Sequence, residues 1–237
     1  MAPYDWLCSF EDVGPAVLAL LPGPEARVLV VGCGNSPFSS ELFARGYRRL
    51  TNVDNCASVV AAQRDRYPML EWVVGDCRAL PFGDGAFDAV LDKGLLDNLY
   101  CYADADAAVA EFRAEAARVL APAGRLVALS CHDRAATLAA LDDARLWACA
   151  VAALANPRYP RIDIPEYQGA VCRRGGGDAA ALLADALAAL DAGTAAPTPG
   201  RLAHLDRRAS GRRHSAIVAG GESHGGGAAG PGRYPEG

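Results

Sequence analysis

The stretch Val28-Leu29-Val30-Val31-Gly32-Cys33-Gly34-Asn35-Ser36 decides the fold. Its first four residues are apolar and mostly β-branched, with no polar alternation, which predicts a strand buried on both faces, as in a parallel sheet. The two glycines allow a tight turn where a ligand can approach bare backbone. Asn35 or Ser36 can cap the helix that follows, and Pro37 fits its first position. The stretch therefore predicts a strand, a nucleotide-binding loop and a helix whose free N–H groups face the ligand.

Short apolar runs continue to alternate with helical segments along the chain. Helices between successive strands imply right-handed crossovers and a mostly parallel sheet. The sequence thus predicts an α/β fold with a doubly wound, mostly parallel seven-stranded sheet, helices on both faces and an antiparallel last strand. The expected strands are 27–31, 50–54, 70–74, 87–91, 125–130, 146–154 and 168–172. The expected helices are 13–21, 37–45, 57–66, 105–120, 135–141 and 178–190.

The 237 residues suffice for one domain and additional material. We expect the domain to span 1–174, followed over 175–237 by an Ala-rich helix and a low-complexity, flexible tail. Residues 194–237 are rich in Pro, Gly, Ala and Arg. Within them, the apolar island Ala216-Ile217-Val218 could alternatively form a strand.

Composition and charge limit the partners, the cysteine chemistry and the cellular location to be expected. The net charge of -5 gives no support for a nucleic-acid partner. The eight cysteines are scattered singly without a Cys-x-x-Cys pair, so we expect reduced, buried thiols, with neither a disulfide framework nor a metal site. Cys33, Cys101, Cys131 and Cys149 lie in apolar contexts that fit this interpretation. No secretory signal or apolar span of about 18 residues is visible, which predicts a cytoplasmic protein that does not bind membranes.

Polar residues follow the strands at the edge where a parallel sheet binds ligands. Asp54 lies 20 residues after Gly34, where a carboxylate can accept the ribose hydroxyls of an adenosine, although it can also cap the next helix. Gly75-Asp76-Cys77 can meet the adenine edge, or form a simple turn. A nicotinamide fingerprint requires glycine where this chain has Pro37. The pattern favours an adenosine compound without a pyrophosphate.

These residues carry a family resemblance. They are Gly32-Cys33-Gly34-Asn35-Ser36, Asp54, Asp76 and Asp92-Lys93-Gly94-Leu95-Leu96-Asp97. Together they resemble the motifs of the class I S-adenosylmethionine-dependent methyltransferases. More narrowly, the chain is similar over about 4–130 to the elongation factor 1 alpha type of lysine methyltransferases, which carry an Asp/Glu-Lys-Gly-Thr-Leu-Asp motif. Tyr4-Asp5-Trp6-Leu7 is similar to a Tyr-Asp-Trp-Phe segment of that group. Leu95 and Asn98 depart from the Thr and Ala common there.

The resemblance implies a role for each matching residue. Tyr4 would close over the cofactor, Gly32 would meet its methionine moiety, and Lys93 would lie near the cofactor or its carboxylate. Asp54 and Asn55 would bind the ribose. Asp76 and Cys77 would flank the adenine. The expected cofactor-binding residues are Tyr4, Gly32, Gly34, Asp54, Asn55, Asp76, Cys77 and Lys93.

The expected reaction moves the methyl group of S-adenosylmethionine to an acceptor, for which we expect a lysine amine of a protein substrate. S-adenosylhomocysteine would be the product. Asp92, Asp97 and either Tyr100 or Tyr102 are candidates for the rim of the substrate channel, or else ordinary loop residues. No general base is assigned. The sequence leaves two alternatives open: a small-molecule methyltransferase, and a non-catalytic scaffold that binds S-adenosylmethionine.

Overall fold

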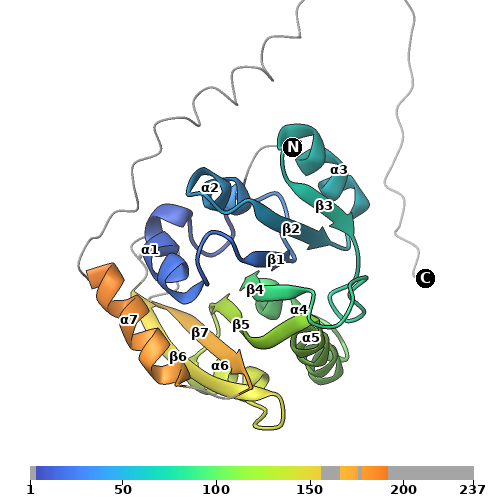
Figure 1. Cartoon of the computed structure of the whole chain (residues 1–237). Coiled ribbons are helices and arrows are strands. Elements are labelled where there is room, and N and C mark those ends of the chain that lie inside the picture. Colours follow the sequence, from blue (N-terminus) through green and yellow to red (C-terminus); the bar gives the residue numbers. More distant parts are fainter. Residues whose placement is uncertain (1–3, 156–165, 176–177, 192–237) are drawn as a thin grey trace, which may run out of the picture. The chain divides into compact units, whose positions relative to one another are not determined.

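The computed structural model describes residues 4–155, 166–175 and 178–191 and contains one seven-stranded sheet (Figure 1). The predicted island at 216–218 and the predicted tail lie outside the described residues. The strands are β1 (Arg27–Val31), β2 (Arg49–Asp54), β3 (Glu71–Val74), β4 (Phe87–Lys93), β5 (Leu120–Ser130), β6 (Trp147–Ala155) and β7 (Glu166–Arg174). The helices are α1 (Phe10–Leu20), α2 (Phe38–Ala44), α3 (Ala57–Arg66), α4 (Leu95–Leu99), α5 (Ala105–Val119), α6 (Arg134–Leu141) and α7 (Ala179–Asp191).

The strand order is β3-β2-β1-β4-β5-β7-β6. Strands β1 to β5 pair in parallel, whereas β7 runs antiparallel to both β5 and β6. The order reverses between β1 and β4, and ligands of such sheets bind at the carboxyl ends of the strands flanking that point. The predicted doubly wound, mostly parallel sheet is confirmed.

The central strand β1 is buried on both faces because its side chains alternate between two apolar layers. Val28 and Val30 face a cluster with residues of α1, α2, α3 and α7. Leu29 and Val31 face a second cluster with residues of α4, α5 and α6. These two layers cover opposite faces of the sheet and hold the β1–α2 loop at its edge.

The Ala-rich helix α7 packs against the sheet and α1. Its Ala179 and Leu183 are buried within the same apolar layer as α1. The sequence alone did not indicate whether this segment contacts the domain. The domain boundary at residue 174 stays a prediction.

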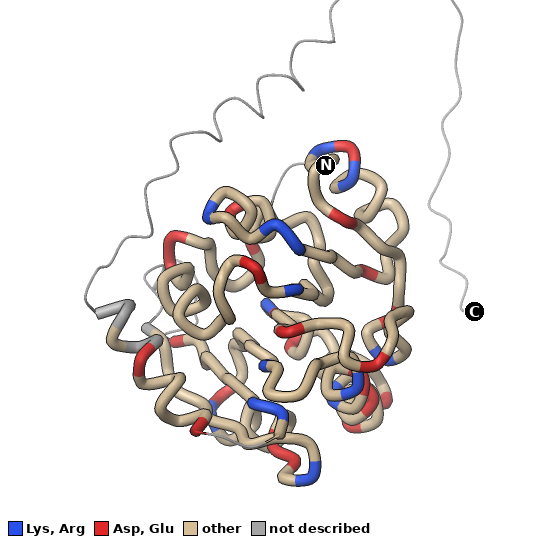
Figure 2. Tube along the Cα trace, in the orientation of Figure 1, with Lys and Arg blue, Asp and Glu red and all other residues tan. Residues whose placement is uncertain are grey.

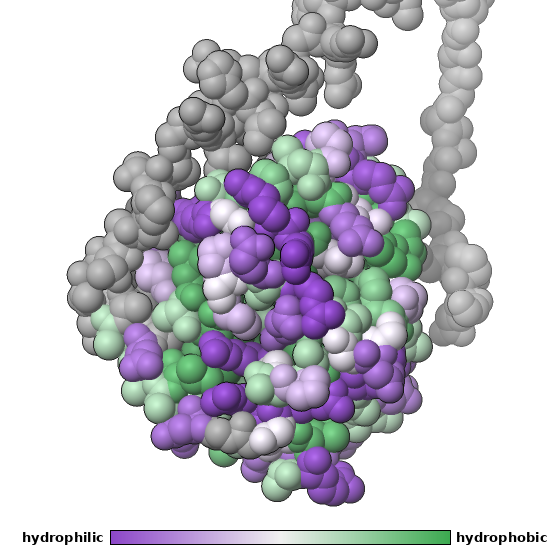
Figure 3. Space-filling view, viewed as in Figure 1, coloured by the Kyte–Doolittle hydropathy of each residue, from purple (hydrophilic) through white to green (hydrophobic). Residues whose placement is uncertain are grey.

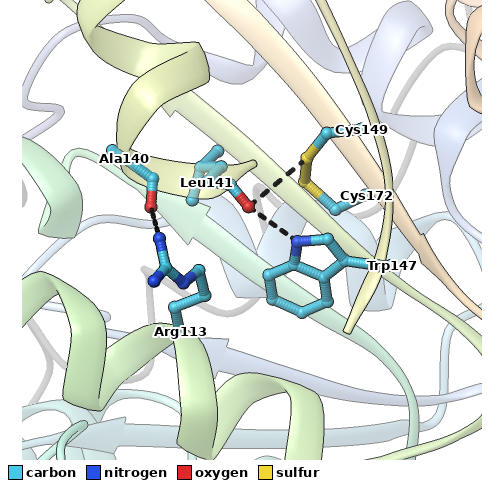
Figure 4. Close-up of a disulfide and its surroundings, with 6 residues drawn as sticks. All are labelled: Arg113, Ala140, Leu141, Trp147, Cys149 and Cys172. Carbon is cyan, nitrogen blue, oxygen red and sulfur yellow. Dashed lines mark hydrogen bonds between the residues drawn. A yellow bond between two sulfur atoms is a disulfide. The ribbon is translucent and has the colours of Figure 1, made fainter. Parts of the chain in front are cut away.

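The structure corrects the interpretation of the cysteines as uniformly reduced. Cys149 on β6 and Cys172 on β7 form a disulfide (Figure 4). The two residues are register partners in the antiparallel ladder, with their Cα atoms 4.1 Å apart. A separation of 23 residues gives no sequence signal for this pairing, which depends on strand register. The other six cysteines are free thiols.

Surface properties of the described residues are mixed. Lys and Arg alternate with Asp and Glu along the chain (Figure 2), and hydrophilic and hydrophobic side chains are interspersed on the face shown in Figure 3. Within the described ranges, every helix is too short or too polar to cross a bilayer. The predictions of a cytoplasmic location and of no nucleic-acid partner stay predictions.

Candidate cofactor site

A cavity of about 280 Å³ opens at the carboxyl ends of β1, β2 and β4. It lies where the strand order reverses, as the sequence predicted. The loop after β1 forms one wall, and residues after β2, β3 and β4, the start of α2 and the N-terminal segment form the others. Predicted residues in its lining are Tyr4, Gly32, Gly34, Asp54, Asn55, Cys77, Lys93 and Tyr102, joined by Trp6, Ser36, Phe38, Leu95 and Asn98.

The loop after β1 depends on glycine at its first position. Gly32 has φ +58°, in the left-handed region that favours glycine. A Cβ at position 32 would also lie 2.9 Å from the Leu95 Cβ atom, closer than side chains pack. The Cys33 N–H donates to the Val53 carbonyl (3.2 Å), which ties the loop to β2. The loop therefore presents bare backbone to the cavity.

Asp54 joins the two loops that flank the cavity. Its Oδ2 accepts a hydrogen bond from the Gly34 N–H (2.9 Å), and its Oδ1 accepts one from the Cys56 N–H (2.9 Å). A carboxylate has about four acceptor sites, so each oxygen retains capacity for a hydroxyl group of a ligand. The carboxylate can thus organise the backbone and bind a ribose at the same time.

Asp76 is the one predicted cofactor residue that is absent from the cavity lining within the described part of the chain. The Arg78 guanidinium donates to both of its oxygens, with distances of 2.8–3.1 Å, and these bonds lower the pKa of the carboxyl. The neighbouring Cys77 does line the cavity. Burial, aided by the Asp76 charge, raises the pKa of the Cys77 thiol to about 12, so the thiol is neutral near pH 7.

Lys93 lines the cavity, but its ammonium binds the N-terminal segment. Its Nζ donates to the Trp6 carbonyl (2.7 Å) and the Cys8 carbonyl (3.3 Å) and lies 3.5 Å from Asp5 Oδ1. The predicted contact with a cofactor carboxylate therefore competes with three partners that the amine already has.

Asp92 and Asp97, the predicted rim residues, do not line the cavity. Asp92 is fully buried, and its carboxylate accepts hydrogen bonds from the Leu95 N–H (2.7 Å) and the Leu96 N–H (3.1 Å). Asp97 is 8% exposed and accepts hydrogen bonds from the Ser130 hydroxyl (2.5 Å) and the Cys131 N–H (3.1 Å). Both acids turn inward because α4 starts directly after β4, where a loop was expected.

Of the two tyrosines predicted as candidates for the channel rim, one lines the cavity and the other does not. Tyr102 lines the cavity, whereas Tyr100 packs edge-on against His132, with ring centroids 4.4 Å apart. Asp133, which follows His132 in the chain, caps α6 by accepting a hydrogen bond from the Ala136 N–H (2.8 Å). Among the candidates for a channel rim, Tyr102 alone faces the cavity.

Trp6 and Asn98 are two of the side chains in the cavity wall that the sequence did not predict. Trp6 was noted within the Tyr-Asp-Trp segment but received no role, although the same segment supplied Tyr4. Asn98 was noted only as a departure from the family motif, because the short helix α4 that places it at the cavity was not expected. A five-residue helix is too short to show the period of an amphipathic helix.

Comparison with known proteins agrees with this geometry. Residues 29–128 match the family model described as a methyltransferase domain. They contain β2 to β4 and most of β1 and β5. The matched region and the fold are those of the class I S-adenosylmethionine-dependent methyltransferases. The fold and the cavity at the reversal of strand order are those expected from the resemblance.

Curated proteins are similar to part of this chain. It is 41% identical over 140 residues to EEF1A lysine methyltransferase 4 of Bos taurus, with 54% of each chain covered. It is 36% identical over 165 residues to eEF1A lysine and N-terminal methyltransferase of Danio rerio, covering 68% of this chain and 24% of the relative. The chain thus spans about half the length of the first curated relatives that it matches.

Solved structures support the fold of the methyltransferase. The N-methyltransferase NodS from Bradyrhizobium japonicum, determined in complex with S-adenosyl-L-homocysteine, superposes with a TM-score of 0.56 at 17% identity. The match covers 70% of this chain and 86% of NodS. A Haloferax volcanii methyltransferase complex with its Trm112 activator gives a TM-score of 0.55 at 19% identity. At these identities the likeness concerns the fold.

Proposed function

We propose that this methyltransferase binds S-adenosylmethionine in the 280 Å³ cavity and transfers its methyl group to a lysine amine of a protein substrate. The observation that carries the cofactor assignment is Asp54, which lies at the end of β2 and bridges the loops that follow β1 and β2. The relatives named as elongation factor 1A lysine methyltransferases support the choice of acceptor.

Each part of the cavity has a proposed role. Asp54 and Asn55 bind the ribose, and the bare backbone at Gly32 and Gly34 accommodates the methionine moiety. Cys77 supplies a neutral, half-buried wall for the adenine. Tyr4 covers the cofactor from the N-terminal side. The role of Asp76 at the adenine stays a prediction from the resemblance.

The chemistry requires positioning more than acid or base groups. The neutral amine attacks the sulfonium methyl carbon in line, the carbon–sulfur bond breaks, and S-adenosylhomocysteine leaves with the electron pair. Holding the two reactants in line and excluding water supply most of what the protein must contribute. Trp6, Asn98 and Tyr102 line the cavity and are the side chains proposed to guide the amine.

The test is incubation of the purified protein with methyl-labelled S-adenosylmethionine and purified elongation factor 1A, followed by peptide mass spectrometry. The proposal expects label on a lysine of the elongation factor. An Asp54→Asn sample serves as the low-activity control. A parallel reaction with a cell extract separates the alternatives: label only in small molecules contradicts the lysine acceptor. Cofactor binding without any labelled product indicates a non-catalytic scaffold.

A further inference from the structure

The N-terminal residues 4–8, here called the strap, cross one side of the cavity. Tyr4 and Trp6 both line it, and they are 59% and 49% exposed, so much of each ring faces solvent. Leu7 and Cys8 at the other end of the strap are buried in the core, and the Tyr167 hydroxyl donates to the Leu7 carbonyl (2.6 Å). The strap is therefore anchored by packing at its C-terminal end.

Polar contacts hold the strap along its length, and three of them converge on one amine. The Lys93 side chain is 7% exposed, and its Nζ binds Asp5 and the Trp6 and Cys8 carbonyls. Asp5 Oδ1 also accepts a hydrogen bond from the Ser36 hydroxyl (2.5 Å), and the Tyr4 N–H donates to the Asn35 carbonyl (3.4 Å). These bonds connect the strap to β4 and to the glycine loop, which are two walls of the same cavity.

Glycine at position 94 allows the strap to lie this close. A Cβ at this position would be 2.6 Å from Trp6 Cδ1, and φ there is +86°. The indole therefore packs directly on the backbone next to Lys93. A buried ammonium is costly unless it is paired, and the partners of this one include an acid and two carbonyls, all on the strap.

We propose that Lys93 is a positioning residue, which holds the strap across the cavity by binding Asp5 and the Trp6 and Cys8 carbonyls. Lys93 then raises cofactor affinity by keeping Tyr4 and Trp6 in the cavity wall, without contacting the cofactor carboxylate. The identity of the cofactor in this statement rests on the proposed function. The strap must release part of these contacts each time the cofactor exchanges.

The first test needs no ligand. In Lys93→Met the side chain keeps its unbranched shape and most of its length, and it loses its charge and donors. Hydrogen exchange should then accelerate about tenfold at the Cys8 and Tyr4 amides, since loss of hydrogen bonds to a charged group weakens the closed strap by about this factor. Amides of β1 should keep their protection. Unchanged exchange in the strap would overturn the proposal.

The second test separates a strap role from direct contact with the cofactor. S-adenosylhomocysteine carries a carboxylate, whereas 5′-methylthioadenosine lacks the amino-acid part. If Lys93 acts through the strap, Lys93→Met weakens binding of both ligands by a similar factor in calorimetry. Weakening confined to S-adenosylhomocysteine would show a carboxylate contact and refute the strap role. Failure of the wild-type protein to bind either ligand would instead contradict the proposed function.

Variants on the strap side keep the proposal testable if Lys93→Met does not fold. Asp5→Asn removes the acidic partner of Lys93 and should accelerate exchange of the strap amides in the same direction. Ser36→Ala removes the bond from the Ser36 hydroxyl to Asp5 and the bond that this hydroxyl accepts from the Phe38 N–H (3.2 Å). It leaves the Lys93 contacts in place, so its effect on the strap amides should be smaller. Equal protection of the strap amides in Asp5→Asn and wild type would contradict the proposal.

Discussion

At the scale of single residues, Asp54 carries the strongest prediction. Asp54→Asn replaces one carboxylate oxygen by an NH₂ group, which then faces a backbone N–H at Gly34 or Cys56. It also removes the charge that strengthens hydrogen bonds from a ribose, worth about 1.5–3 kcal/mol each. We expect the dissociation constant for S-adenosylhomocysteine to rise at least about tenfold in calorimetry.

Asp88→Asn is the matched control for this measurement. Asp88 lies near the start of β4, accepts hydrogen bonds from Arg27 and does not line the cavity. Its substitution should leave ligand binding near the wild-type value. An Asp54→Asn protein that binds as well as wild type would refute the ribose assignment.

Asp92 predicts an unusual dependence of stability on pH. Burial, together with the charge of Asp97, raises the pKa of the Asp92 carboxyl to about 7. Between about pH 4 and pH 7 the folded state then binds a proton that the unfolded state has released. The contribution of this group to the free energy of unfolding is fully present below about pH 4 and is lost as the pH rises through about 7. The slope approaches about 1.4 kcal/mol per pH unit.

Urea unfolding at several pH values checks this expectation against Asp92→Asn. The variant lacks the titrating carboxyl, so its free energy of unfolding should fall less steeply between pH 4 and pH 7. Parallel pH profiles for the two proteins would contradict the raised pKa.

Residue spacing alone predicted the place of Asp54 at the cavity, but it did not predict the inward orientation of Asp92 and Asp97. The position of Asp54 follows from strand length and loop length, which the sequence shows directly. The inward orientation of the other two acids depends on the start of α4, which Asp92 itself caps through the Leu95 and Leu96 amides. That feature depends on side-chain geometry, and acids after a strand look alike in sequence whether they face solvent or backbone.

At the scale of elements, β1 and α3 agree with the predicted ranges and the other strands differ by a few residues. Continuous apolar runs and capped, periodic helices are local signals. The start of β5 at Leu120 was missed because Pro122 and Gly124 follow it, and its register against β4 shifts between Phe87 and Ala89. The disulfide was missed because it depends on which residues of β6 and β7 face each other.

Reduction of the disulfide should destabilise the β6–β7 hairpin side of the sheet. Cys149 and Cys172 close a loop with a sequence separation of 23, and such a cross-link stabilises a fold by about 3 kcal/mol through the unfolded state. We expect the free energy of unfolding to drop by about this amount in a phosphine reductant. A Cys149→Ser/Cys172→Ser protein should be insensitive to the reductant. If the wild-type protein were equally stable with and without the reductant, the disulfide would contribute nothing to stability.

At the scale of the whole molecule, the cavity draws its walls from segments far apart in the sequence. The strap, the glycine loop, and the ends of β2, β3 and β4 all contribute. None of these walls exists in the unfolded chain, so a ligand of the cavity binds only the folded state. Cofactor binding must then stabilise the entire domain by mass action, and each element that lines the cavity shares in that stabilisation.

A thermal shift experiment tests this coupling and the ligand class together. At 100 times its dissociation constant, S-adenosylhomocysteine should add about 2.7 kcal/mol, which raises the melting temperature by roughly 5–11 °C for a chain of this size. NAD serves as the control ligand, because its pyrophosphate requires a third loop glycine where the chain has Pro37. NAD should leave the melting temperature unchanged. A shift with NAD as large as with S-adenosylhomocysteine would mean that the cavity recognises adenosine alone, and the methionine side of the site would have to be reassigned.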